Sequence, residues 1–144
     1  MILAPERELL LLDTNIILHL IRGKETARRV DELFQIRHRT ERPLISIVSV
    51  GEALALSRKW AWGEQKRGDL EELMRELVIV DIRSRDVLDH FAELHSFTRS
   101  HGRIIGDNDL WIAATAAATG AHLITTDADF DILHPDRIRR TLIP

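Results

Sequence analysis

Four carboxylate residues stand at positions from which they can act together: Asp13, Glu52, Asp109 and Asp127. Asp13 directly follows an apolar run at residues 9–12, and Asp127 comes two residues after another apolar segment. Glu52 lies one helical turn beyond a third apolar segment, and Asp109 falls in the first turn of an alanine-rich helix. Each acid is therefore predicted at the carboxyl end of a strand or at the amino end of a helix.

Carboxylates gathered in one site repel one another strongly, and a bound divalent cation removes that repulsion. Mg²⁺ and Mn²⁺ are the expected ions, because they prefer oxygen ligands and keep several waters. Such an ion lowers the pKa of a bound water and orients it toward a phosphorus atom, and a second ion steadies the leaving oxygen. The four acids predict metal-dependent hydrolysis of phosphodiester bonds, with the number of ions left open.

Polar residues beside these acids are candidates to orient them. Thr14, Asn15, Asn108 and Thr125 can hold carboxylates and waters by hydrogen bonds around a metal site. Asp129 follows Asp127 by two residues and competes with it for the fourth acidic position. The spacing from the preceding strand favours Asp127, with Asp129 as a helper. We interpret Asp107 as the cap of the alanine-rich helix rather than as a ligand.

Each of the four acids also fits a local structural role. Asp13 suits the N-cap of a helix, and Glu52 completes the capping-box pattern that begins at Ser49. Asp109 suits a helix dipole, and Asp127 suits a turn. Four independent local roles would not by themselves bring the acids to one edge of a sheet, which favours the shared site.

The elements that must position the acids follow from hydrophobic periodicity and capping residues. Strands are predicted at residues 9–12, 43–48, 78–82 and 122–125, with a further edge strand within 138–143. Helices are predicted at residues 16–21, 26–38, 49–60, 64–76, 84–98 and 107–119. Short apolar strands that alternate with helices are typical of an α/β domain with a mainly parallel sheet, whose ligands bind beyond the carboxyl ends of the strands. We expect one domain over residues 1–144.

The composition limits the classes of function. The chain has no cysteine, which excludes disulfides, thiolate catalysis and zinc–thiolate sites. The net charge of −3 is not the basic balance of most nucleic-acid-binding domains, although arginines are concentrated in a few segments. The N-terminal residues lack the basic and apolar regions of a signal peptide, and no apolar run is long enough for a bilayer. We expect a cytoplasmic protein without a membrane segment.

Four stretches of the sequence resemble the motifs of the PIN-domain nucleases, and in particular the VapC toxins of bacterial toxin–antitoxin pairs. They are residues 11–15 (LLDTN), 46–52 (SIVSVGE), 102–114 (GRIIGDNDLWIAA) and 123–130 (LITTDADF). The third stretch is the most specific, and the four occur in the family's order across nearly the whole chain. Residues 60–99 contain no motif that we can match.

The resemblance implies an α/β/α sandwich and an endoribonuclease that depends on Mg²⁺ or Mn²⁺. Asp13 and Asp109 match the family's best-attested metal ligands, and Glu52 and Asp127 complete its acidic set. The resemblance also implies a homodimer, a small antitoxin protein that masks the site, and tRNA or rRNA as the substrate class.

Three other interpretations remain open from the sequence. A PIN nuclease can serve RNA processing or DNA metabolism rather than act as a toxin. A PIN-like domain can also bind RNA or protein without cleaving, although the presence of all four acids argues against this. A receiver-like signalling domain would need a lysine after a late strand, whereas Lys24, Lys59 and Lys66 all lie on or beside predicted helices.

Overall fold

The computed structural model describes residues 8–144, so the N-terminal segment that we compared with a signal peptide lies outside the described residues. Within this range one sheet contains β1 (Leu10–Leu12), β2 (Leu44–Ser46), β3 (Val78–Val80), β4 (His122–Thr125) and β5 (Arg139–Leu142). Their order across the sheet is β3-β2-β1-β4-β5, and every neighbouring pair is parallel. The predicted α/β class with a mainly parallel sheet is confirmed.

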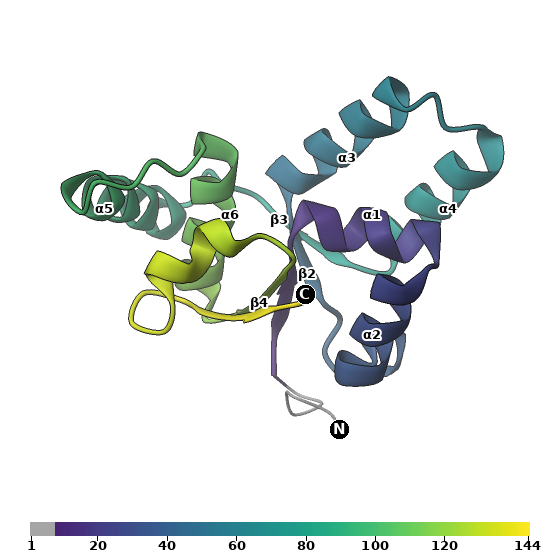
Figure 1. The fold of residues 1–144 in the computed structure, drawn as a ribbon, viewed down its shortest axis with the longest axis horizontal. Coiled ribbons are helices and arrows are strands. Elements are labelled where there is room, and N and C mark those ends of the chain that lie inside the picture. The colour runs from purple at the N-terminus through teal and green to yellow at the C-terminus, as the bar shows by residue number, and fades with distance from the viewer. Residues whose placement is uncertain (1–7) are drawn as a thin grey trace.

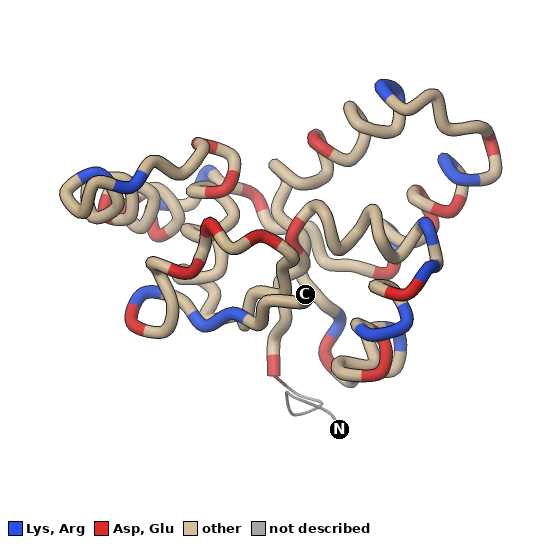
Figure 2. Tube along the Cα trace, viewed as in Figure 1, with Lys and Arg blue, Asp and Glu red and all other residues tan. Residues whose placement is uncertain are grey.

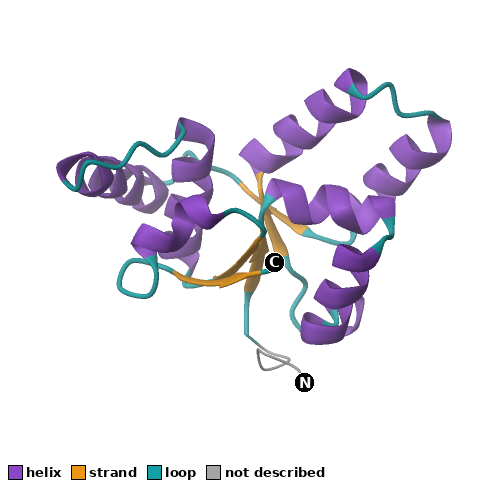
Figure 3. Cartoon of the chain, in the orientation of Figure 1, coloured by secondary structure: helices purple, strands orange, loops and turns teal. Residues whose placement is uncertain are grey.

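Helices cover both faces of this sheet (Figures 1 and 3). The α-helices of the described range are α1 (Thr14–Arg22), α2 (Glu25–Phe34), α3 (Ile47–Lys59), α4 (Glu64–Arg75), α5 (Arg85–Ser100) and α6 (Asp107–Thr119). Two short 3-10 helices, η1 (Ile36–His38) and η2 (Ala128–Leu133), complete the chain. Helices α1 to α4 lie on one side of the sheet, and α5 and α6 lie on the other (Figure 1), which gives the three-layer α/β/α arrangement. In residues 8–144 no helix is both long enough and apolar enough to cross a bilayer.

The side chains of the central strands alternate between two hydrophobic cores. Leu10 and Leu12 of β1 pack into the core beneath α1, α2 and α4, whereas Leu11 packs into the core beneath α5 and α6. Ile124 and Leu123 of β4 divide in the same way. All five side chains are completely buried, as expected for central parallel strands with helices on both faces.

Capping residues fix where the helices begin and end. Asp13 caps α1, and Gly23 ends this helix with a φ of +68°, which a glycine adopts without steric cost. Gly120 ends α6 in the same left-handed conformation, with a φ of +70°. Both glycine stops had been predicted, and they turn the chain sharply into α2 and into β4.

Two details of the predicted helices are wrong. Helix α3 begins at Ile47, where the Ser46 hydroxyl accepts a hydrogen bond from the Val48 N–H, so no capping box links Ser49 to Glu52. Ser46 and Ser49 both suit an N-cap, and the early end of β2 favours the first. The cap of α6 is Gly106, and Asp107 is the first helical residue rather than the cap.

Candidate metal and active site

The parallel sheet brings the predicted acids toward one edge. Asp13 follows β1, and its N–H donates to the Ile124 carbonyl of β4 at 3.0 Å, which fixes the end of the two central strands. Asp127 follows β4 as the N-cap of η2. Glu52 lies on α3, and Asp109 lies in the first turn of α6. The acids thus come from helices on both faces of the sheet and from the ends of its two central strands.

Asp13 is the most buried acid, with only 3% of its surface exposed. Its Oδ1 accepts a hydrogen bond from the Thr14 N–H at 2.8 Å, and its Oδ2 accepts one from the Thr125 hydroxyl at 2.7 Å. Burial raises the pKa of Asp13, the two hydrogen bonds oppose that rise, and the charges of Asp127 and Glu52 add to it. The carboxylate is therefore held in one orientation at an energetic cost that a cation would relieve.

Thr125 connects Asp13 with the segment after β4. Its hydroxyl donates to Asp13 and accepts a hydrogen bond from the Asp127 N–H at 2.9 Å. The side chain is completely buried, so this hydroxyl has no competing water. Two acids from different strands are consequently held in a fixed relation by one side chain, the kind of support that orients metal ligands.

Glu52 is held from two sides. Its Oε1 accepts a hydrogen bond from the Thr14 hydroxyl at 2.7 Å, and its Oε2 accepts one from the Asn108 amide at 3.1 Å. Thr14 belongs to α1 and Asn108 to α6, so Glu52 joins three helices at the rim of the sheet. These contacts explain Thr14 and Asn108 as supporting residues. Asn15, also predicted to support the site, is exposed and makes no side-chain hydrogen bond within the described residues.

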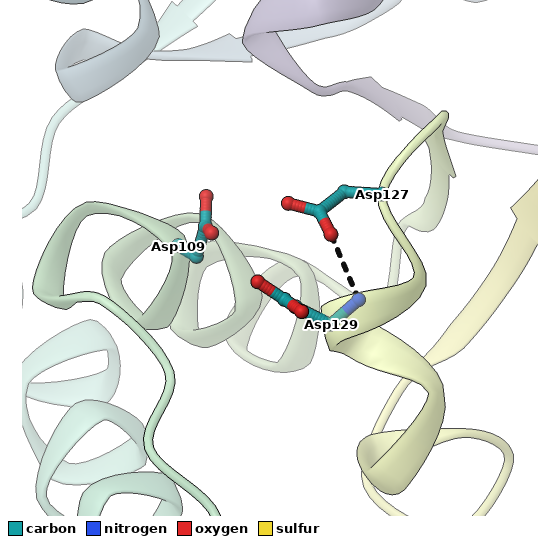
Figure 4. Close-up of side chains that lie close together, drawn as sticks. All are labelled: Asp109, Asp127 and Asp129. Atoms are coloured by element: carbon teal, nitrogen blue, oxygen red, sulfur yellow. Dashed lines mark hydrogen bonds between the residues drawn. The ribbon is translucent and has the colours of Figure 1, made fainter.

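Asp109, Asp127 and Asp129 form the tightest group of carboxylates in the described part of the chain. One oxygen from each lies within 4.8 Å of the other two. Figure 4 shows the three side chains converging, with Asp127 Oδ1 accepting a hydrogen bond from the Asp129 N–H at 2.8 Å. Asp129, predicted as a helper, is thus as close to Asp109 as Asp127 is, because the turn into η2 directs both side chains toward α6.

The electrostatics of Asp109 connect all five acids. Burial raises its pKa to about 7, and the charges of Asp13, Asp127, Glu52 and Asp129 add to the rise in that order. An aspartate with such a pKa is only partly ionised at neutral pH. The crowded group contains only oxygen donors, so it fits a hard divalent cation, which would favour the ionised form of every acid.

Sequence reasoning missed Ser49 as a residue of the site. It is completely buried, and its hydroxyl lies 2.8 Å from that of Thr14, the residue that holds Glu52. The spacing contained the signal, because residues three apart on a helix share a face, and Ser49 precedes Glu52 by three. The expected capping box gave Ser49 another role and hid this one.

Comparison with known proteins gives the same picture from the sequence. The family model described as PIN domain matches residues 10–133. Ribonuclease VapC1 of Haemophilus influenzae (strain R2866) is 34% identical over 120 residues, which cover 80% of this chain and 84% of the relative.

Solved structures resemble the whole fold. The crystal structure of VapBC2 from Rickettsia felis, bound to a DNA fragment from its promoter, matches with a TM-score of 0.78 and 27% identity, over 93% of this chain and 98% of that one. VapBC-1 from nontypeable Haemophilus influenzae matches with a TM-score of 0.72 and 25% identity, over 93% and 97% of the two chains. The match thus extends beyond the acidic motifs to nearly all of the chain.

Proposed function

The chain belongs to the PIN-domain family, and on that premise we propose that it is an endoribonuclease and the toxin of a VapBC-type toxin–antitoxin pair. The observation that carries the proposal is the convergence of Asp13, Glu52, Asp109, Asp127 and Asp129 at one edge of the sheet. The relative at 34% identity is named a ribonuclease, and both structural matches are VapBC complexes. The reaction is hydrolysis of an RNA phosphodiester bond, with tRNA or rRNA as the substrate class.

The proposed metal ligands are Asp13, Glu52, Asp109 and Asp127, and we add Asp129 because of its distance from Asp109 and Asp127. Mg²⁺ or Mn²⁺ is the proposed ion, since every candidate donor is a carboxylate oxygen. When bound, the ion would lower the pKa of a coordinated water and stabilise charge on the phosphate.

The chain's own residues supply the positioning. Thr125 and the Thr14 N–H fix both oxygens of Asp13. The Thr14 hydroxyl and Asn108 fix the two oxygens of Glu52. No serine, cysteine or histidine is needed as a nucleophile, because the attacking group in this chemistry is water. The role of these side chains is to hold the acids in place before the substrate arrives.

An antitoxin protein and a second copy of the chain are the proposed partners. The structural matches to VapBC complexes support the antitoxin, and the family resemblance of the sequence supports the homodimer. A small antitoxin gene next to the gene for this chain would support the toxin role. The cytoplasmic location expected from the sequence stays a prediction.

The test is cleavage of a mixed tRNA and rRNA pool by the purified protein in Mg²⁺, in Mn²⁺ and in EDTA. We expect cleavage with either ion, none in EDTA, and a loss of activity in Asp109→Asn. Asp107→Asn is the matched control, because it makes the same change of charge two residues away in the same exposed first turn. Cleavage in EDTA, or equal cleavage by Asp109→Asn and the unsubstituted chain, would overturn the proposal.

A further inference from the structure

A second polar site lies at the opposite edge of the sheet from the acids. A cavity of about 440 Å³ opens beside Pro43 and Leu77, the residues that immediately precede β2 and β3. It lies between η1 and the end of α4, whereas the acids follow the carboxyl ends of the strands. The nuclease site does not use this cavity.

Four arginines line the cavity: Arg37, Arg39, Arg42 and Arg75. Glu76 is its one acidic lining residue within the described chain. Around α2 and the segment that follows it, Lys and Arg alternate with Asp and Glu along the chain (Figure 2), so the excess of positive charge is a property of the cavity rather than of the whole region.

Two of these guanidinium groups are fixed by backbone carbonyls. Arg42 donates from Nε to the Glu76 carbonyl at 3.0 Å and from Nη2 to the Leu77 carbonyl at 3.2 Å and to the Arg75 carbonyl. Arg39 donates to the carbonyls of Phe34 and Glu8, both at 2.9 Å. Carbonyls orient a guanidinium without cancelling its formal charge, so both cations are held in place and stay positive.

The other two arginines have no such structural duty. Arg37 meets Glu76 at 3.4 Å, but both side chains are largely exposed, and an exposed pair of this kind contributes little. Arg75 makes no ion pair within residues 8–144 and lies at the end of α4. Capping of helix ends therefore explains the placement of Arg39 and Arg42 but not the presence of Arg37 and Arg75.

We propose that this cavity binds a nucleotide through its phosphate group. Guanidinium groups match phosphate oxygens with paired hydrogen bonds, and four of them around one acid favour an anion of more than one charge. The apolar wall of Ile36, Leu73 and Leu77 offers a surface for a base or a ribose. The volume lies in the ordinary range of small-ligand sites. A free nucleotide and one nucleotide of an RNA strand share this chemistry, and neither depends on the proposed nuclease activity.

The test measures binding in EDTA, so that a metal-bound nucleotide at the acidic site does not contribute. Adenosine, AMP, ADP and a short single-stranded RNA are titrated into the intact chain by calorimetry. The variant Arg37→Gln/Arg75→Gln removes two cavity charges and leaves Arg39 and Arg42 in place at the helix ends. Arg58→Gln/Arg67→Gln is the control, because it removes the same charge from exposed positions outside the cavity lining.

We expect AMP, ADP or RNA to bind and adenosine not to bind. Affinity should fall about tenfold or more in Arg37→Gln/Arg75→Gln, the usual loss for a charged hydrogen bond, and should be unchanged in the control. Binding of the mononucleotides identifies a free nucleotide as the ligand, whereas binding of RNA alone identifies an RNA strand. Absence of binding, equal loss in both variants, or equally tight binding of a polyglutamate peptide would overturn the proposal. Since no metal is present, these outcomes are independent of RNA cleavage at the acids.

Discussion

Thr125 lies between two acids of the candidate site and contacts both. Its hydroxyl donates to Asp13 Oδ2 and accepts from the Asp127 N–H, and it is fully buried. A buried polar group that loses its partner costs more than the same loss at the surface. One side chain therefore affects both the stability of the sheet end and the orientation of a proposed ligand.

Thr125→Val removes the hydroxyl and keeps the branched shape. We expect RNA cleavage to fall by about ten- to a hundredfold, the usual cost of losing a group that orients a metal ligand. The free energy of unfolding should fall by about 1–3 kcal/mol, because two buried partners lose a hydrogen bond. Cleavage rates and urea unfolding measure the two effects. Thr125→Ser restores the hydroxyl and should restore most of the rate, and a fully active Thr125→Val would contradict the orienting role.

Asp109 makes the metal-free protein sensitive to pH. Its pKa is about 7 in the folded chain, whereas its ordinary value is 3.8. Between these two values the folded form holds more protons than the unfolded form, so stability falls as the pH rises through this window and levels off above it. The contribution of Asp109 is fully present below its ordinary pKa and is lost above pH 7.

We therefore expect the melting temperature in EDTA to fall from pH 5 to pH 8 more steeply for the unsubstituted chain than for Asp109→Asn, which has no proton to lose. Thermal unfolding of both proteins across this range provides the measurement. Asp107→Asn should follow the unsubstituted chain. Parallel curves for the unsubstituted chain and Asp109→Asn would show that Asp109 titrates near its ordinary value.

Helices α5 and α6 hold each other in place and so position the first turn of α6. The rings of Phe91 and Trp111 stack with centroids 3.8 Å apart and an interplanar angle of 18°. Trp111 lies two residues after Asp109, and the small side chains of α6 let it pack closely beneath. The position of Asp109 depends in this way on a contact between helices as well as on its place in the sequence.

Phe91→Ala should lower the free energy of unfolding by about 2 kcal/mol, somewhat below the cost for a fully buried phenylalanine, because Phe91 is half-buried. Leu88→Ala, on the exposed side of the same helix, should cost about 0.5 kcal/mol or less. Urea unfolding of both variants checks the difference. Equal costs would mean that the ring stack does not stabilise the pair of helices.

Much of each element could be predicted from local chemistry, and the exceptions have local causes. The glycine stops at Gly23 and Gly120 and the alternation of leucines in β1 identify the elements clearly. The start of α3 could not be predicted, because Ser46 and Ser49 both suit a cap and only the end of β2 selects between them. The approach of Asp129 to Asp109 depends on the turn into η2, which the sequence does not reveal.

At the scale of the whole molecule, the parallel sheet determines where the acids and the arginine-lined cavity lie. Parallel strands end at one edge, so acids that follow β1 and β4 meet there without any long-range pattern in the sequence. This edge could be predicted from the strand ends alone. The strand order β3-β2-β1-β4-β5 could not, because pairing depends on which crossovers pack together, and that order also brings Pro43 and Leu77 to the same cavity.

Folding brings the acids together against their repulsion, so an ion that binds only the folded chain should stabilise the whole molecule. At about a hundred times its dissociation constant, such an ion contributes about 2.7 kcal/mol, which corresponds to a rise in melting temperature of about 5–10 °C for a chain of this size. We expect this rise for Mg²⁺ or Mn²⁺ measured against EDTA. The double variant Asp109→Asn/Asp129→Asn removes two of the repelling charges, so it should be more stable than the unsubstituted chain in EDTA and should gain less from the ion. Asp107→Asn should gain as much as the unsubstituted chain. A double variant that is less stable in EDTA would show that these carboxylates support the fold themselves, and the repulsion argument for a cation would then fail.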